Sequence, residues 1–211
     1  MNDGEWVAVV LTAVDHGRLP DPTASTDHLR VLDAIARLPA DGPPELPPLT
    51  DELAALFGVW RDVADSVVID AWRAADHVET LARLGDRAAV AMRGTALVHA
   101  DLRLDNVLIV EDDACIVDWP WASLGPAWFD AVTYLLDVRA QGGVLPDGWF
   151  EHPAFLGATD DDVSAVLAGL AAYFFEAASW APPAGMDALQ RSRNDQGVAA
   201  LAWLRERCEL G

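Results

Sequence analysis

The sequence contains no lysine. All fourteen basic residues are arginine, against 34 aspartates and glutamates, and the formal net charge is −20 at pH 7. A protein that binds nucleic acid needs clustered positive charge to neutralise phosphates, so this balance predicts no nucleic-acid partner. The charge is compatible with a small cationic substrate, and equally with an acidic surface that only keeps the protein soluble.

Cysteines and long apolar runs are also scarce. Two cysteines, Cys115 and Cys208, are too few for a disulfide framework, and Cys115 lies in an apolar segment where we expect a buried free thiol. No apolar run approaches the roughly 20 residues of a membrane-spanning helix. Residues 1–5 are acidic and lack the basic start of a signal peptide. These features predict a cytoplasmic protein with no membrane partner.

Most of the chain has the apolar spacing of amphipathic helices. In the first of them, Leu29, Leu32 and Ala36 are expected to share one face. Thr159 and Asp162 form a capping-box pattern, which makes the acidic run 160–162 a helix start rather than a metal site. Helices are predicted from residue 26, over 50–64 and 67–84, from 126 to about 138, from 160 onward and over 186–208.

Three short segments have strand character. Residues 5–14 are rich in β-branched side chains and predict a buried strand. Residues 107–110 and 114–117 predict a hairpin that is apolar on both faces and therefore buried on both sides. Residues 39–48 contain five prolines and predict an irregular connection. The expected fold class is mainly α (α+β), with enough residues for a substantial core.

Polar residues gather at the open end of this hairpin. If Val107 faces Val117, then Asn106 faces Asp118 across the ladder, with Cβ atoms about 5 Å apart. An amide oxygen and a carboxylate at that separation can share a hard cation such as Mg²⁺. We therefore predict that Asn106 and Asp118 are metal ligands.

The residues before the hairpin complete a candidate catalytic loop. Asp101 lies five residues before Asn106, where a carboxylate can accept a hydroxyl proton beside a metal-bound phosphate. His99 is expected to hold the loop by hydrogen bonds. Arg103 follows two residues after Asp101, either at the surface or paired with Asp105; the resemblance to kinases described next implies an equal alternative, contact with the transferred phosphate.

The motif His99-x-Asp101-x₄-Asn106, followed by a hairpin and Asp118, resembles the catalytic and metal-binding loops of kinases. The surrounding sequence is similar to the aminoglycoside phosphotransferase and choline kinase-like family, as are residues 124–130 and 186–207. By this resemblance Asp101 is the catalytic base, Asn106 and Asp118 hold Mg²⁺, and Asp130 supports the loop. The sequence departs from the family pattern at Ala100, which replaces a common glycine, and at Pro120.

The resemblance implies the helical C-lobe of a protein-kinase-like fold with a buried catalytic hairpin and a largely absent N-lobe. Residues 1–20 would be a remnant of the last N-lobe strand and the hinge, and residues 21–211 the C-lobe. The adenine of ATP, or the guanine of GTP, would lie against the strand end formed by Leu11, Thr12, Ala13 and Val14. The glycine-rich loop and the lysine of the N-lobe have no counterpart in these 211 residues.

Two interpretations remain open at this stage. The first is a phosphotransferase acting on a hydroxyl of an aminoglycoside-like or amino-alcohol substrate, weak or inactive without an N-lobe or a partner chain. The second is a non-catalytic lobe that binds a small molecule or a partner. If the net charge serves a cationic substrate, acidic side chains from residues 67–84 and 160–180 should line the cleft near Asp101.

Overall fold

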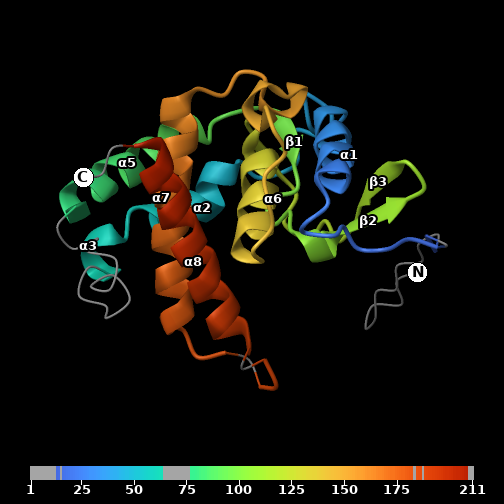
Figure 1. Ribbon diagram of the computed structural model, residues 1–211. Helices are drawn as coiled ribbons and strands as arrows, with labels where there is room; N and C mark the ends of the chain where they lie inside the picture. Colours follow the sequence, from blue (N-terminus) through green and yellow to red (C-terminus); the bar gives the residue numbers. More distant parts are fainter. Residues whose placement is uncertain (1–12, 15, 64–76, 183, 187, 209–211) are drawn as a thin grey trace, which may run out of the picture.

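The computed structural model describes residues 13–14, 16–63, 77–182, 184–186 and 188–208. These ranges are mostly helical and include two small antiparallel sheets of two strands each (Figure 1), so the predicted mainly α class is confirmed. The helices are α1 (Ser25–Ala36), α2 (Leu49–Phe57), α3 (Trp60–Val63), α5 (Val78–Ala91), α6 (Phe129–Ala140), α7 (Asp160–Ser179) and α8 (Ala188–Arg207). The strands are β1 (Ala96–Val98), β2 (Val107–Val110), β3 (Asp113–Ile116) and β4 (Ser123–Gly125).

Helix α7 is the centre of the core. It packs against α8 and α5, and Figure 1 shows α7 and α8 as a long pair lying side by side. Within the described part of the chain it is the one helix whose length and composition would suit a membrane span, but 67% of that window is buried inside the fold. Its apolar residues therefore serve as core contacts for the neighbouring helices.

The acidic start of α7 is a helix cap, as the sequence predicted. The Thr159 hydroxyl accepts a hydrogen bond from the Asp162 N–H at 3.1 Å, and the Thr159 N–H donates to the Asp162 carboxylate at 3.3 Å. Asp160 and Asp161 pair with Arg207 and with an arginine of α5. Negative charge at a helix N-terminus is also favoured by the helix dipole.

The buried face of α1 differs from the predicted one. Leu29 and Ala36 are exposed, whereas His28, Val31 and Ile35 are buried together with Leu32. The histidine is part of this face because its Nδ1 lies 2.9 Å from the Tyr134 hydroxyl of α6. The spacing of apolar residues alone therefore assigned the wrong buried face to α1, because a hydrogen-bonded polar side chain, His28, occupies a core position.

Two other helix predictions need new boundaries. The predicted helix 50–64 is interrupted at Gly58, which ends α2, and a separate turn of helix, α3, follows. The predicted helix 67–84 lies partly outside the described residues. Its described part belongs to α5, which extends seven residues further than predicted, to Ala91.

The hairpin has a different register from the predicted one. Val107 pairs with Ile116 and Val110 with Asp113, one residue off the expected alignment. The prediction assumed a three-residue turn over 111–113, whereas the turn contains only Glu111 and Asp112, with Glu111 in the left-handed region at φ 53°. Asn106 consequently faces Val117, whose N–H donates to the Asn106 carbonyl at 3.0 Å, and Asp118 lies one residue beyond.

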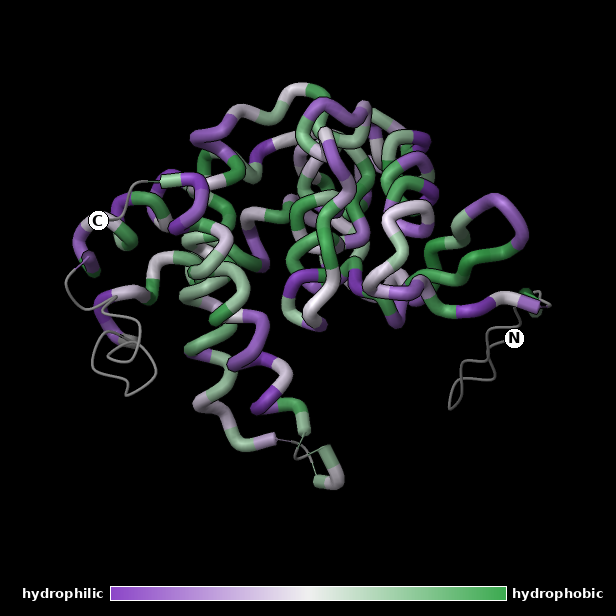
Figure 2. The backbone as a smooth tube through the Cα atoms, viewed as in Figure 1, coloured by the Kyte–Doolittle hydropathy of each residue, from purple (hydrophilic) through white to green (hydrophobic). Residues whose placement is uncertain are grey.

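The hairpin is buried on one side only. Val107 and Ile109 of β2 are buried, while β3 is partly or fully exposed along its length, and Cys115 is only half-buried. Helix α1 packs against both strands. Figure 2 shows apolar strands that end in a hydrophilic tip projecting from the body of the fold. The prediction of burial on both sides is wrong because one helix covers one face.

The second sheet was not predicted. β1 pairs with β4, and the proline-rich segment 39–48 runs irregularly along it, as its composition indicated. Backbone bonds from Leu97 to Pro39 and from Leu124 to Pro47, at 3.0 and 2.9 Å, fix this segment to the sheet. Strands of three residues carry too little periodic pattern to be found in a sequence.

The segment before α1 is fixed by backbone and side-chain contacts. Arg18 exchanges two backbone hydrogen bonds with Ile109, at 3.1 and 2.7 Å. Its guanidinium binds both oxygens of the buried Asp27 on α1, at 2.5 and 2.8 Å, and this pairing lowers the pKa of Asp27. Most of the predicted strand 5–14 lies outside the described residues, but Ala13 and Val14 are exposed and not in a strand.

Close packing of α7 against α2 gives a test of the core. A Cβ at Gly169 would overlap the ring of Phe57, so Gly169→Ala should lower the free energy of unfolding by about 1–3 kcal/mol, the usual range for overpacking. Because alanine has a higher helix propensity than glycine, a lower free energy of unfolding can only come from the steric overlap with Phe57. Gly58→Ala is the matched control, because its nearest neighbours are 3.8 Å away or more. Urea unfolding of both variants makes the comparison, and equal stabilities would contradict this packing.

Candidate active site

The predicted catalytic loop follows β1 and is organised by His99. This side chain is fully buried, and its Nε2 lies 2.9 Å from the carbonyl of Val117, just before Asp118. Its Nδ1 accepts a hydrogen bond from the Asp101 N–H at 3.3 Å, which assigns the proton to Nε2. The ring also meets Trp119 edge-on, with centroids 4.9 Å apart. His99 thus links the loop of Asp101 to the segment of Asp118.

Asp130 holds the same loop from α6. One carboxylate oxygen accepts the His99 N–H at 2.6 Å and the other accepts the Ala100 N–H at 3.0 Å. Ala100 has φ 66°, a left-handed conformation that glycine adopts without a steric penalty. This conformation explains why glycine suits the position. With alanine there, the hydrogen bond from the Ala100 N–H to Asp130 stabilises the left-handed conformation.

A second carboxylate of α6, Asp137, holds the loop on the other side of Asp101. It is 5% exposed and accepts the Leu104 N–H at 2.9 Å. The side-chain amides of Gln141 and Gln196 also donate to it, at 3.0 and 3.3 Å. Sequence reasoning missed Asp137, although its spacing of seven residues from Asp130 places both on one face of a helix.

Asp101 and Arg103 project from the loop between these two anchors. The Asp101 side chain is 41% exposed, and its carboxylate lies 3.8 Å from the Arg103 guanidinium. Arg103 also binds Asp105 at 2.9 and 3.0 Å, which is the alternative pairing considered from the sequence. Burial raises the pKa of Asp101, while the charge of Arg103 opposes the rise. A carboxylate with a raised pKa is a better proton acceptor than an ordinary surface aspartate.

Asn106 and Asp118 lie at the open end of the hairpin. Asn106 is 5% exposed, and its Nδ2 donates to the Asp101 carbonyl at 2.8 Å, which leaves its side-chain oxygen free to accept. Asp118 is exposed and has φ 63°, so the chain turns sharply there. The two residues are not cross-strand partners as predicted. In the described ranges no three His, Cys, Asp or Glu side chains are placed to share a metal ion.

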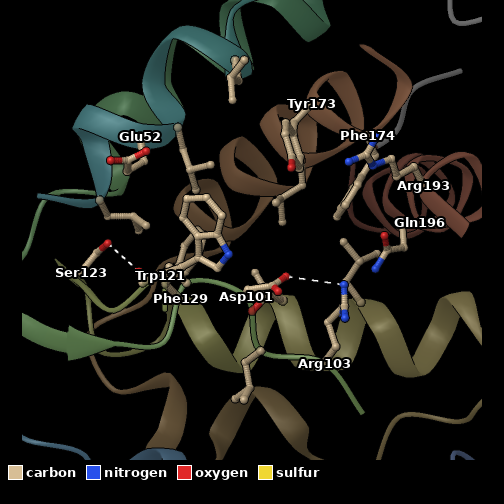
Figure 3. A pocket seen from close by; sticks show the side chains of 18 of the residues that line it. Glu52, Asp101, Arg103, Trp121, Ser123, Phe129, Tyr173, Phe174, Arg193 and Gln196 are labelled. Atoms are coloured by element: carbon tan, nitrogen blue, oxygen red, sulfur yellow. Dashed lines mark hydrogen bonds and ion pairs between the residues drawn. The ribbon is translucent and has the colours of Figure 1, made fainter. Parts of the chain in front are cut away.

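A cavity of about 410 Å³ opens beside Asp101 (Figure 3). Its walls come from α2, the catalytic loop, α6, α7 and α8, and most of the lining side chains are apolar or aromatic. The charged side chains in the wall are Glu52, Asp101, Arg103 and Arg193. A volume in this range, with few polar groups, is typical of pockets for small molecules.

Two sequence predictions about the cleft have different outcomes. Residues 160–180 contribute Leu170, Tyr173, Phe174 and Trp180 to the wall and no acidic side chain, and nothing from 77–84 lines it. The predicted acidic lining is therefore wrong for residues 77–84 and 160–180, while residues 67–76 lie outside the described residues. Of the predicted nucleotide contacts, Leu11 and Thr12 lie outside the described residues and the other two are exposed.

The burial of Asp130 predicts a pH effect on stability. Burial raises the pKa of Asp130 to about 6, although the bonds from His99 and Ala100 oppose the rise. An unfolded aspartate titrates near 3.9, so ionising the buried group destabilises the fold as pH rises from about 4 to above 6. Urea unfolding should show the stability of the wild type, relative to Asp130→Asn, falling over this interval by on the order of 1–3 kcal/mol.

An exposed acid provides the control for that titration. Asp147→Asn removes the same charge from the surface and should track the wild type at every pH. If the free energy of unfolding of the wild type instead rose relative to that of Asp130→Asn as the pH increases, the fold would stabilise the charged carboxylate, contrary to this prediction.

Both the sequence and the fold are similar to those of known proteins. Residues 3–182 match the model of APH, the phosphotransferase enzyme family. The fold resembles the crystal structure of a choline/ethanolamine kinase family protein from Mesorhizobium loti, with a TM-score of 0.58 and 19% identity over 92% of this chain and 67% of that one. No curated protein matches the sequence. The chain therefore belongs to APH, the phosphotransferase enzyme family, as its motif indicated.

Proposed function

We propose that this protein transfers the γ-phosphoryl group of Mg²⁺-bound ATP or GTP to a hydroxyl of a small molecule in the cavity beside Asp101. The observation that carries the proposal is the position of Asp101. It lies on a loop fixed by two buried carboxylates, with a cavity of small-molecule size on one side, and Asn106 and Asp118 at the hairpin end follow it in the chain. A rigid loop matters because phosphoryl transfer depends mainly on positioning and on charge stabilisation.

Asp101 has the role of general base in this proposal. Its half-exposed carboxylate borders the cavity, so a hydroxyl of an occupant can donate a hydrogen bond to it and give up its proton as the new O–P bond forms. Arg103 lies 3.8 Å from Asp101 and provides a permanent positive charge beside the transferred phosphoryl group. His99 and Asp130 hold the backbone on which both side chains depend.

Asn106 and Asp118 would hold the metal. The Asn106 amide is oriented by its bond to the Asp101 carbonyl, which leaves an oxygen as the ligand, and Asp118 is an accessible carboxylate. Oxygen donors of this kind suit Mg²⁺, which keeps several waters and phosphate oxygens and needs few protein ligands. When bound, the ion neutralises charge on the β- and γ-phosphates.

The proposal also includes the class of acceptor and the source of the lysine that full activity requires. The resemblance suggests aminoglycoside-like and amino-alcohol acceptors, and a possible second lobe or partner chain would supply the lysine that these 211 residues lack. The absence of that lysine is also what favours the second candidate function, a non-catalytic lobe that binds a small molecule or a partner.

Nucleotide binding tests the hairpin end. Asp118→Asn should weaken Mg²⁺-dependent binding of ADP by about tenfold or more, because one charged ligand of the ion is lost. Isothermal titration calorimetry with and without Mg²⁺ measures the effect. Asp112→Asn is the matched control, since it removes the same charge from the exposed tip of the same hairpin and should change nothing. Equal losses in both variants would show that only the net charge matters.

Turnover tests the catalytic residues. We expect the 211-residue chain alone to transfer phosphate far below the usual kinase range of about 1–100 s⁻¹. Each missing electrostatic contact costs on the order of 10²–10³ in rate, and both the lysine and the phosphate-covering loop are missing. Whatever rate is measured by product formation from radiolabelled ATP, Asp101→Asn should lower it by a further 10²–10⁴. Ordinary kinase rates from the isolated chain, or an undiminished rate in the variant, would contradict this.

A further inference from the structure

The charge of the cavity differs from the charge of the protein. The whole chain has 34 acidic residues and 14 arginines, but among the described residues the cavity wall contains two of each: Glu52 and Asp101 against Arg103 and Arg193. An acceptor with several ammonium groups would need an excess of carboxylates around it. A wall with balanced charge does not select such a molecule.

The aromatic wall is also unsuited to a cation at its α7–α8 end. The guanidinium of Arg193 already lies over the Trp180 ring, 5.5 Å from its centroid. A ligand ammonium there would meet the positive charge of Arg193 instead of a free ring face. The part of the cavity near Trp180 therefore repels cations.

Arg193 has donor capacity left for a ligand. One of its nitrogens donates to the Ala177 carbonyl at 2.9 Å, and none of the carboxylates in the described residues lies within ion-pair distance of it. A guanidinium has five N–H donors, so most of them are available in a wall of the cavity. This planar donor set binds carboxylates and phosphates through two parallel hydrogen bonds, and of the two groups the carboxylate is the one that an acceptor not yet phosphorylated carries.

The rest of the wall is mostly apolar and includes a few neutral polar side chains: Ser123, Thr133, Tyr173, Ser192 and Gln196. Leu170, Phe174 and Leu136 line it, and the Tyr173 side chain projects into it (Figure 3). Burial raises the pKa of Tyr173, so its hydroxyl stays protonated and can donate. We therefore expect the body of the occupant to be mostly apolar or aromatic, because most of the wall offers no hydrogen-bond partner to a polar group that loses its water.

We propose that the acceptor is an amphipathic hydroxy acid: its hydroxyl lies at Asp101, its apolar body fills the middle of the cavity, and its carboxylate binds Arg193. The assignment of the hydroxyl end rests on the proposed phosphotransferase function. The apolar body and the carboxylate end rest on the cavity wall alone.

Three compounds with one scaffold and one hydroxyl test the charge preference: 4-(hydroxymethyl)benzoate, 4-methylbenzyl alcohol and 4-(aminomethyl)benzyl alcohol. Their affinities for the protein are measured by calorimetry or ligand-observed NMR, without nucleotide, at physiological salt. The carboxylate should bind about tenfold or more tightly than the neutral alcohol, and the amine most weakly. Tighter binding of the amine, equal binding of all three, or no binding of any at millimolar concentration would overturn the proposal.

Variants on α8 assign the preference to one side chain. Arg193→Gln should reduce the advantage of the carboxylate to less than about threefold, while Arg193→Lys should retain part of it because the charge remains. Arg191→Gln is the matched control, since it removes the same charge from an exposed position on the same helix that does not line this cavity. A carboxylate preference that survives in Arg193→Gln would place the anion elsewhere and overturn the assignment.

Binding and turnover separate this proposal from the proposed function. If the carboxylate compound binds through Arg193 but no rate of phosphorylation that Asp101→Asn lowers is measured with Mg²⁺-ATP and any of the three compounds, the phosphotransferase function fails and the pocket assignment is supported. If only the neutral or the cationic alcohol is phosphorylated, the phosphotransferase function is supported and the assignment of a carboxylate to Arg193 fails. Circular dichroism of Arg193→Gln confirms that the lost bond to Ala177 has not unfolded α7.

Discussion

The site depends on two buried carboxylates that α6 presents to the backbone of one loop. Asp130 accepts the amides of His99 and Ala100, and Asp137 accepts the amide of Leu104. Asp101 lies between these anchors. Because the loop backbone is held on both sides, its side chains are displayed in a fixed direction without being tied to the core. Buried acids are energetically costly, and their position here is explained by the three amide donors that the loop would otherwise leave unpaired.

Asp137 also connects this loop to the cavity beside Asp101. Its second oxygen accepts from Gln196, and Gln196 lines the cavity from α8. Helices α7 and α8 therefore form part of the core and also part of the cavity wall. Through Gln196, α8 contacts Asp137, which holds the loop of Asp101. The elements that stabilise the fold and those that shape the pocket are the same, which is why an apolar core helix such as α7 also supplies Tyr173 and Phe174.

The hairpin end shows how a local turn decides a distant geometry. A two-residue turn at Glu111 and Asp112 sets the register, and every pairing down to Asn106 follows from it. Asp118 falls one residue beyond the ladder and adopts a left-handed conformation, while His99 fixes the carbonyl just before it. Asp118 thus lies outside the ladder, and it is exposed.

The sequence by itself determined the helical class, the cap of α7, the family and the loop that bears Asp101, because periodicity, caps and motif spacing are local properties that neighbouring residues specify. The tertiary structure alone decided the hairpin register, the buried face of α1 and the role of Asp137. The last two depend on contacts between distant segments, since His28 meets Tyr134 and Asp137 accepts an amide 33 positions away. The register depends on a turn with one residue fewer than the apolar pattern indicated. The tertiary structure also decided the charge of the cavity, since composition sums charges over the whole chain, whereas folding selects the few that face a ligand.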